Sequence, residues 1–200
     1  MMHATKGMCA FCWDKIRDEL TPGTGCKVDR GITDKECALF VSLKETTTNA
    51  LRGCIGTFGE KPCSDQLNTY AIQCAFHDDR FYPVSKNEIG SLTVSVTLLS
   101  NFTPIDHCLD WIVGKHGVLI EFQDPGTQKR LSAVFLPSVM TEKCWDQQET
   151  ISQLMRKAGY EGLLRDVALT DISAITFQGS TAELSYKDYI ADWQKSPSRL

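Results

Sequence analysis

The sequence predicts an α+β protein with a mostly antiparallel sheet flanked by helices. Strand-like segments occur in pairs around turn residues, as in hairpins, and segments with the 3.6-residue period of helices lie between the pairs. The order hairpin, helix, strand occurs at about 38–98 and again at about 118–186. We therefore expect an internal duplication of this unit.

The first half begins with a helix over 9–20, because its apolar residues recur at helical spacing, and "TPGTGCKVDRG" ends it. "CALFVSLKE" and "ALRGCIGTF" flank "TTTN" and predict a hairpin. We expect Ser64 to cap the next helix, which ends near "HDDR". "SKNE" is typical of a capping box, and the alternation in "LTVSVTL" predicts a half-buried strand.

The second half repeats this order with other residues. "GVLIEF" and "LSAVFLP" flank a Pro-Gly turn and predict a second hairpin. Asp146 and Glu149 form an Asp version of a capping box for a helix that Gly159 ends. "AITFQ" and "AELSY" predict two further strands. No linker separates the halves, so we expect one domain over 1–200.

The composition limits the classes of function. A formal net charge of -4 and a pI near 5.6 argue against nucleic-acid binding through bulk charge. The N-terminal segment does not read as a signal peptide, and no apolar run is long enough to cross a membrane, so we expect a cytoplasmic or nuclear protein. Nine cysteines then predict free thiols.

One stretch, "LRGCIGTF" at 51–58, combines residues that could carry chemistry. As a strand it places Arg52, Cys54 and Gly56 on one side. A nearby guanidinium favours the thiolate, the nucleophilic and metal-binding form of cysteine. Gly53 and Gly56 would let a ligand or another backbone approach closely. The structural alternative is a packed strand whose Cys54 is simply a small buried residue.

Two histidines are further candidates. His77 opens "HDDRF", where a helix gives way to a loop, and could supply positive charge or a proton. The structural alternative for this segment is an Asp-Arg pair that closes the turn while Phe81 and Pro83 anchor the loop. It favours a structural role for Arg80 and Asp79 over one for His77. His116 lies between glycines and, away from any partner, would be a solvated turn residue. Near Cys54, either histidine could form a thiolate-imidazole pair.

Metal binding has weak support. "CAFC" at 9–12 has the spacing of half a zinc site, but no second pair follows and both thiols lie on the apolar helix face, which favours core packing. We predict no metal ligands and name no cofactor. The sequence has no phosphate loop, dinucleotide fingerprint, nucleophile elbow or zinc-protease motif.

Several blocks together resemble the AMME chromosomal region (AMMECR) protein family. "LRGCIGTF" is similar to its hallmark, and "AFHDDRFYPVS", "GKHGVLI", "AVFLPSV" and "KAG" are similar to later blocks in family order, from 51 to 159. The resemblance implies a single α+β unit with an internal duplication around a barrel-like sheet. The family has no established reaction, and its cysteine has only been proposed to be functional.

Relatives in this family are sometimes fused to a MEMO-type domain or accompanied by a radical S-adenosylmethionine protein, which implies redox or covalent-modification chemistry. Our first hypothesis is an enzyme or enzyme component. In it Cys54 is the nucleophile or redox thiol, Arg52 and Arg80 bind an anionic group, and His77 or His116 transfers protons. The alternative is a regulatory or adaptor domain that recognises a protein or nucleic acid, and a third reading gives the motifs a purely structural role.

Overall fold

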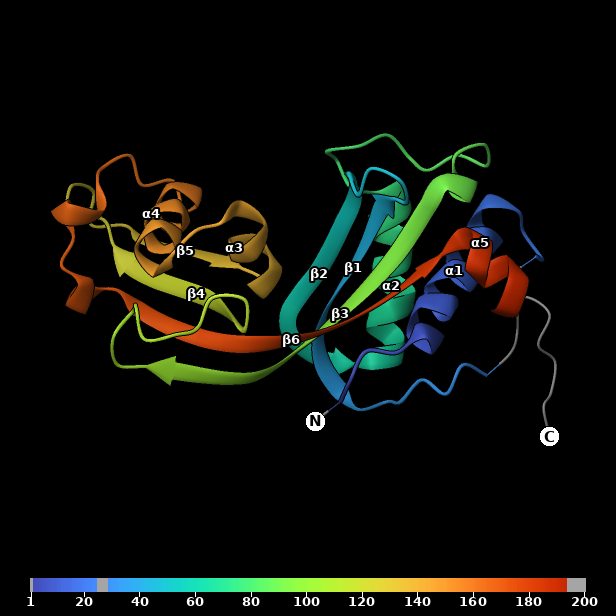
Figure 1. Ribbon diagram of the computed structural model, residues 1–200, viewed down its shortest axis with the longest axis horizontal. Helices are drawn as coiled ribbons and strands as arrows, with labels where there is room; N and C mark the ends of the chain where they lie inside the picture. The colour runs from blue at the N-terminus through green and yellow to red at the C-terminus, as the bar shows by residue number, and fades with distance from the viewer. Residues whose placement is uncertain (1, 25–28, 194–200) are drawn as a thin grey trace. The chain divides into compact units, whose positions relative to one another are not determined.

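A computed structural model describes residues 2–24 and 29–193 and confirms the α+β class (Figure 1). Its strands are β1 (Glu36–Glu45), β2 (Leu51–Pro62), β3 (Leu92–Ile105), β4 (His116–Gln123), β5 (Arg130–Phe135) and β6 (Ser173–Ser185). Its α-helices are α1 (Lys6–Leu20), α2 (Cys63–Phe76), α3 (Pro137–Lys143), α4 (Gln147–Lys157) and α5 (Tyr186–Asp188). Short turns of 3-10 or π helix cover Ile89–Ser91, Leu164–Asp166, Leu169–Asp171 and Tyr189–Trp193. Among these helices none is long and apolar enough to cross a membrane.

The strands follow the order β2-β1-β3-β6-β4-β5, and the chain divides into two compact units. Unit 1 comprises the chain up to residue 99 and from residue 180 onward, and unit 2 comprises 100–179. In unit 1, β1 pairs antiparallel with β2 and β3. In unit 2, β4 pairs antiparallel with β5 and β6. The pairing pattern of hairpin, helix and strand thus recurs, while a duplication and a single-domain organisation stay predictions.

In unit 1, α2 packs against β1 and β2, and α1 packs against α2. Leu92, Val94 and Val96 of β3 are fully buried, as their alternation predicts. Helix α2 approaches β2 closely at Gly53, where an added Cβ would lie 2.3 Å from the carbonyl oxygen of Cys74. The absence of a side chain at Gly53 therefore sets how closely helix and strand pack.

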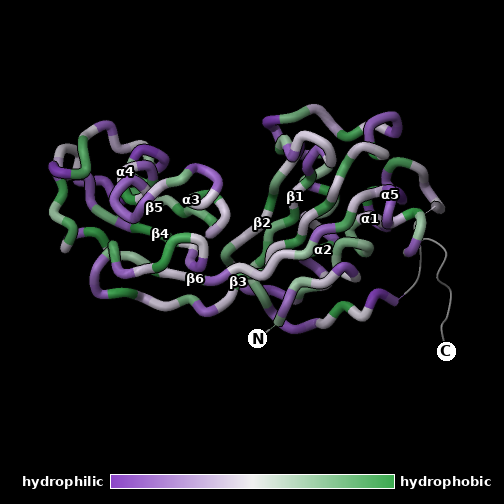
Figure 2. The backbone as a smooth tube through the Cα atoms, in the orientation of Figure 1, coloured by the Kyte–Doolittle hydropathy of each residue, from purple (hydrophilic) through white to green (hydrophobic). Residues whose placement is uncertain are grey.

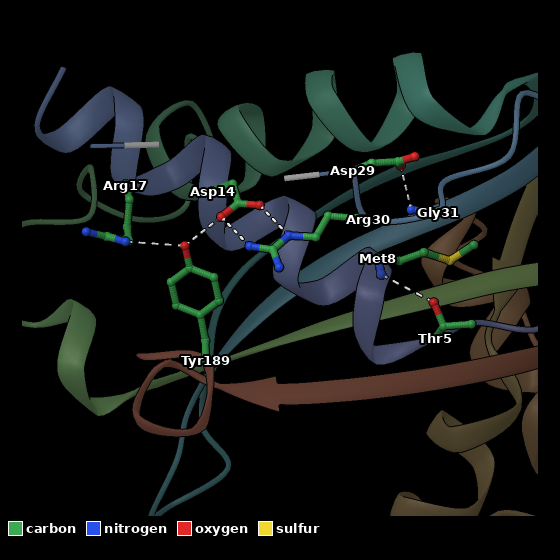
Figure 3. A network of polar contacts seen from close by, with 8 residues as sticks. All are labelled: Thr5, Met8, Asp14, Arg17, Asp29, Arg30, Gly31 and Tyr189. Carbon is green, nitrogen blue, oxygen red and sulfur yellow. Dashed lines mark hydrogen bonds and ion pairs between the residues drawn. The ribbon is translucent and has the colours of Figure 1, made fainter. Parts of the chain in front are cut away.

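A buried polar network joins α1 to the end of the described chain (Figure 3). The Asp14 carboxylate accepts bonds from Arg30 Nε at 2.8 Å and Nη2 at 3.0 Å. Tyr189 donates its hydroxyl to the same carboxylate at 2.6 Å and accepts from Arg17 Nη1 at 3.3 Å. Asp14 is only 4% exposed, so the paired Arg30 offsets the cost of burying its charge.

Unit 2 has its own core. Figure 2 shows β4 as a mainly hydrophobic segment and α4 as a mainly hydrophilic one. Helix α4 still buries one face, formed by Thr150, Ile151, Leu154 and Met155. Asp146 caps this helix by accepting from the Glu149 N–H at 2.8 Å, and Gly159 follows its end with φ +90°, both as predicted.

Three local predictions were wrong. Ser64 does not cap α2 but lies inside it, because the helix begins at Cys63 with Pro62 at the cap position, and the Ser64 hydroxyl donates to Asp34 instead. The two strands predicted at "AITFQ" and "AELSY" are one strand, β6. Helix α3 begins at Pro137, where a strand ending was expected, since proline suits the first turn of a helix.

We expect Gly53→Ala to destabilise the protein by about 1–3 kcal/mol, because the new methyl group would collide with the Cys74 carbonyl. Gly90→Ala is the matched control, since an added Cβ there meets open space. Equilibrium denaturation with urea measures both. Equal stability of the two variants would contradict the close packing of α2 on β2.

Candidate functional site

The thiol of Cys54 lies on the strand face that points away from α2. Gly53 faces Cys74 of α2, so its neighbour Cys54 points to the opposite side of β2. Cys54 pairs across the sheet with Ser42 of β1, and the Ser42 hydroxyl donates to the Cys54 sulfur at 3.1 Å. The side chain of Cys54 is half-buried, so the sulfur is neither sealed in the core nor fully solvated.

The backbone of Cys54 is held by side chains instead of by a further strand. Strand β2 ends the strand order, so within the described part of the chain one of its edges has no neighbouring strand. There the Cys54 N–H donates to Asp78 Oδ2 at 2.9 Å, and Arg80 Nη2 donates to the Cys54 carbonyl at 2.9 Å. Both backbone groups of this edge residue are therefore satisfied. We call this arrangement the edge clamp.

The two clamp residues also pair with each other. Arg80 donates Nε to Asp78 Oδ1 at 2.8 Å and Nη2 to Oδ2 at 2.7 Å. The Asp78 side chain is 4% exposed, and its bonds from Arg80 hold the pKa of this carboxyl far below its ordinary value near 3.8. An Asp-Arg pair does form in "HDDRF", as the structural alternative predicts, but its aspartate is Asp78 and not Asp79, which is exposed.

Arg52 makes a second bidentate pair. Its Nε and Nη2 donate to the Glu88 carboxylate at 3.0 and 3.1 Å, and Nη2 also donates to the Tyr82 carbonyl at 2.7 Å. Its Nη1 is buried with no hydrogen-bond partner among the described residues. Binding of an anion by this guanidinium would therefore need the segment between Tyr82 and Glu88 to move. The guanidinium of Arg52 and that of Arg80 both lie over the Phe81 ring, at 5.8 and 5.5 Å from its centre.

Neighbouring atoms fill the space at both glycines of the motif. An added Cβ at Gly53 would meet Cys74, and one at Gly56 would meet the Phe40 ring and the Leu39 carbonyl. These contacts match the structural alternative, in which the glycines admit a neighbouring segment. Neither glycine opens a space for a ligand at its own Cα.

The two histidines lie in different units. His77 is exposed at the end of α2, directly before the clamp residue Asp78, and no hydrogen bond of its imidazole occurs within the described chain. His116 begins β4 in unit 2, and its Nδ1 accepts from the Ile112 N–H at 3.2 Å. Burial, aided by Lys115, lowers the pKa of His116 and favours its neutral form. A role for either histidine in proton transfer stays a prediction.

The other described cysteines divide by exposure. Cys9 and Cys12 are fully buried in the core, which confirms the packing role predicted for "CAFC", and burial raises the pKa of Cys9 to about 12. Of the remaining described cysteines, only Cys144 is exposed. Cys26 lies outside the described residues. The described part of the chain contains no group of three or more residues suited to hold a metal ion.

Three residues of the site were missed in the sequence. Ser42 could not have been found from a simple hairpin register, because a shift between Leu43 and Lys44 sets Ser42 opposite Cys54, where an unshifted ladder would place Val41. Glu88 belongs to the predicted capping box, and its carboxylate does accept from the Ser85 N–H at 2.8 Å. Asp78 carried no signal that distinguished it from Asp79, because only the tertiary contact with β2 shows which aspartate is buried.

We expect Asp78→Asn to lower the free energy of unfolding at pH 7 by about 1.5–3 kcal/mol, because it weakens charged hydrogen bonds to Arg80 and Cys54. The folded-state pKa of Asp78 is depressed, so its contribution exists above the unfolded-state pKa near 3.8 and is lost as the pH falls below it. Urea denaturation at pH values from 7 to 3 measures the free energy of unfolding of both proteins. The difference between wild type and variant should become smaller as the pH falls.

Asp79→Asn is the matched control for this experiment. Asp79 is exposed and has no contact of the kind that Asp78 makes, so its variant should follow the wild type at every pH. If the difference in the free energy of unfolding between Asp78→Asn and wild type stays constant down to pH 3, the stabilising role of the Asp78 carboxylate is contradicted.

Similar proteins identify the family of this chain. The model of the AMMECR1 family matches residues 9–182. An uncharacterised protein of Arabidopsis thaliana is 32% identical over 198 residues, covering 96% of this chain and 90% of that protein. One of Schizosaccharomyces pombe, also uncharacterised, is 43% identical over 140 residues, or 70% of each chain. The crystal structure of an uncharacterised protein from Pyrococcus horikoshii matches with a TM-score of 0.72 and 25% identity, over 92% of this chain and 94% of that one. The resemblance found in the sequence is therefore confirmed, and the chain belongs to the AMMECR1 family.

Proposed function

We propose that this protein is an enzyme, or a component of one, whose reactive group is the thiol of Cys54. One observation carries the proposal: a half-buried sulfur sits beside a hydroxyl donor while the edge clamp fixes the backbone of the same residue. A thiol held in one place by its own main chain can meet a substrate in a fixed orientation. The six other described cysteines that are buried offer no such access.

In the proposed reaction Cys54 acts as a nucleophile, which is active as the thiolate. The sulfur forms a bond to an electrophilic carbon of the substrate, and the displaced group leaves with the bonding electron pair. The thiol proton passes to water or to His77, which precedes the clamp residue Asp78. The Ser42 hydroxyl is placed to donate to the sulfur before the bond forms.

The proposal gives the two arginines a different role from the one expected. Arg52 and Arg80 were predicted to bind an anionic group, yet each already makes a bidentate pair with a carboxylate of this chain. Under the proposal Arg80 acts on Cys54 through the clamp, as a positioning residue. Arg52 ties the start of β2 to Tyr82 and Glu88.

We expect iodoacetamide to label Cys54 in the native protein, because its sulfur is partly exposed, and to label it faster than Cys144 if it is a reactive thiol. Peptide mass spectrometry over time and pH measures both rates in one sample. Cys144 is the internal control for plain exposure, and buried thiols such as Cys9 and Cys12 should be labelled only on unfolding.

Ser42→Ala tests the neighbour of the sulfur, and Ser64→Ala is a matched control whose hydroxyl bonds Asp34 elsewhere. The first variant should change the pH dependence of Cys54 labelling and the second should not. Protection of Cys54 until the protein unfolds would rule out the thiol site in the unliganded protein.

A specific feature favours a second candidate, recognition of a protein partner. Tyr82 is 90% exposed, although Arg52 holds its carbonyl and Phe81 beside it packs under two guanidinium groups. An exposed tyrosine on a fixed backbone costs little entropy to bury in an interface. The partner predicted from the family resemblance, a MEMO-type or radical S-adenosylmethionine protein, is the first to test, and nucleic acid is the alternative.

We expect Tyr82→Ala to weaken binding of that partner by tenfold or more, on the order of a hot-spot residue, without loss of stability. Ile112→Ala, which removes another exposed apolar side chain, is the control. Calorimetric titration of the purified partner into the wild type and into each of the two variants gives the three dissociation constants. Equal affinity of all three proteins would exclude Tyr82 from the interface.

A further inference from the structure

A cavity of about 190 Å³ lies in unit 1, apart from the Cys54 site. It is formed at the end of α1, at the short turn that precedes β3, and at α5. The side chains that matter here are Arg17, Leu20, Thr21, Lys86, Ile89 and Tyr186. At roughly 30 Å³ per water molecule, the volume corresponds to about six waters, below the range typical of drug-sized ligands.

The lining has a marked charge bias. The lining residues within 2–24 and 29–193 include two cations, Arg17 and Lys86, and no carboxylate, in a protein with more acidic than basic residues. An arginine fork and a lysine ammonium are the side chains that bind phosphate and carboxylate groups. Leu20 and Ile89 add an apolar surface beside the charges.

Buried partners orient one of these cations. Arg17 Nη1 donates to the Tyr189 hydroxyl, and its guanidinium lies 5.8 Å from the centre of the Tyr189 ring (Figure 3). Tyr189 in turn donates to Asp14, whose charge Arg30 already balances. Burial and the neighbouring Asp14 raise the pKa of Tyr189 to about 12, so the phenol stays neutral and adds no negative charge beside Arg17.

The C-terminal end of α1 would repel a bound anion, but only weakly. A helix C-terminus carries roughly half a negative charge on its free carbonyls. Two carbonyls at this end are bonded: that of Arg17 in the last turn accepts from the Thr21 N–H at 2.8 Å, and that of the C-cap residue Thr21 accepts from the Thr24 hydroxyl at 2.6 Å. Two full positive charges therefore outweigh the helix end.

We propose that this cavity binds a small organic anion: a phosphate or carboxylate group held by Arg17 and Lys86, with a short apolar body against Leu20 and Ile89. Thr21 and Tyr186 also line this space, and each has a hydroxyl group that can donate to an anion. The volume of about 190 Å³ suits a single small ring or a short chain. The site is independent of the thiol chemistry proposed for Cys54.

The test titrates the full-length protein with phenyl phosphate and follows backbone amide shifts and heat of binding. We expect saturable binding that weakens with salt and shifts amides at Thr21, Ile89 and Tyr186. Benzoate should bind at the same place, and benzyl alcohol, its uncharged counterpart, should bind much more weakly. Inorganic phosphate, which lacks the apolar body, should also bind more weakly than phenyl phosphate.

Lys86→Gln removes one cation at an exposed position and should raise the dissociation constant for phenyl phosphate about tenfold. Lys187→Gln is the matched control, because Lys187 follows Tyr186 but does not line the cavity, and it should bind like the wild type. An unchanged constant for Lys86→Gln, shifts at other residues, or equal binding of benzyl alcohol would overturn the proposal. Cys54→Ser should leave the binding unchanged, which separates this test from that of the thiol.

Discussion

The buried carboxylate of Asp78 is the interaction on which the Cys54 site depends. It lies at the end of α2 and reaches the edge of β2, so it joins helix and strand through one charged group. Its charge is tolerable in a nearly solvent-free position because Arg80 pairs with both of its oxygens. The same arginine closes the arrangement by donating to the Cys54 carbonyl. Strand position, loop conformation and thiol position thus depend on one pair of side chains.

The edge strand at the other end of the strand order is also capped by a side chain. Strand β5 is also an edge strand, and Lys157 at the end of α4 donates to the carbonyl of Val134 at 2.9 Å. In each unit a cation at or just beyond the end of the helix satisfies a carbonyl on the edge strand of the preceding hairpin. Exposed strand edges invite pairing with other chains, and such caps reduce that risk. Two of the blocks that resemble the family, "HDDRF" and "KAG", carry these cations.

The residues of the motif "LRGCIGTF" alternate between the two faces of β2, so one face packs against α2 and the other carries the thiol of Cys54. Gly53 faces α2 and permits the close approach of the helix, whereas Cys54 faces away from α2 and is half-buried. Arg52 fixes the segment that carries Tyr82. A change in the motif will therefore alter stability and site geometry together, unless it is confined to the sulfur.

The sequence by itself determined the α+β class, both hairpins, the buried alternation of β3 and the cap at Asp146, because these features follow from local periodicity and capping chemistry. It also located the motif around Cys54. Only the tertiary structure decided that Asp78 and not Asp79 is buried, that Arg52 and Arg80 pair with carboxylates of this chain, and that β6 is continuous. The physical reason is that burial and charge pairing depend on which segments meet in space. Two neighbouring residues of the same type, such as Asp78 and Asp79, give the same local signal in the sequence, and only the contacts of the folded chain distinguish them.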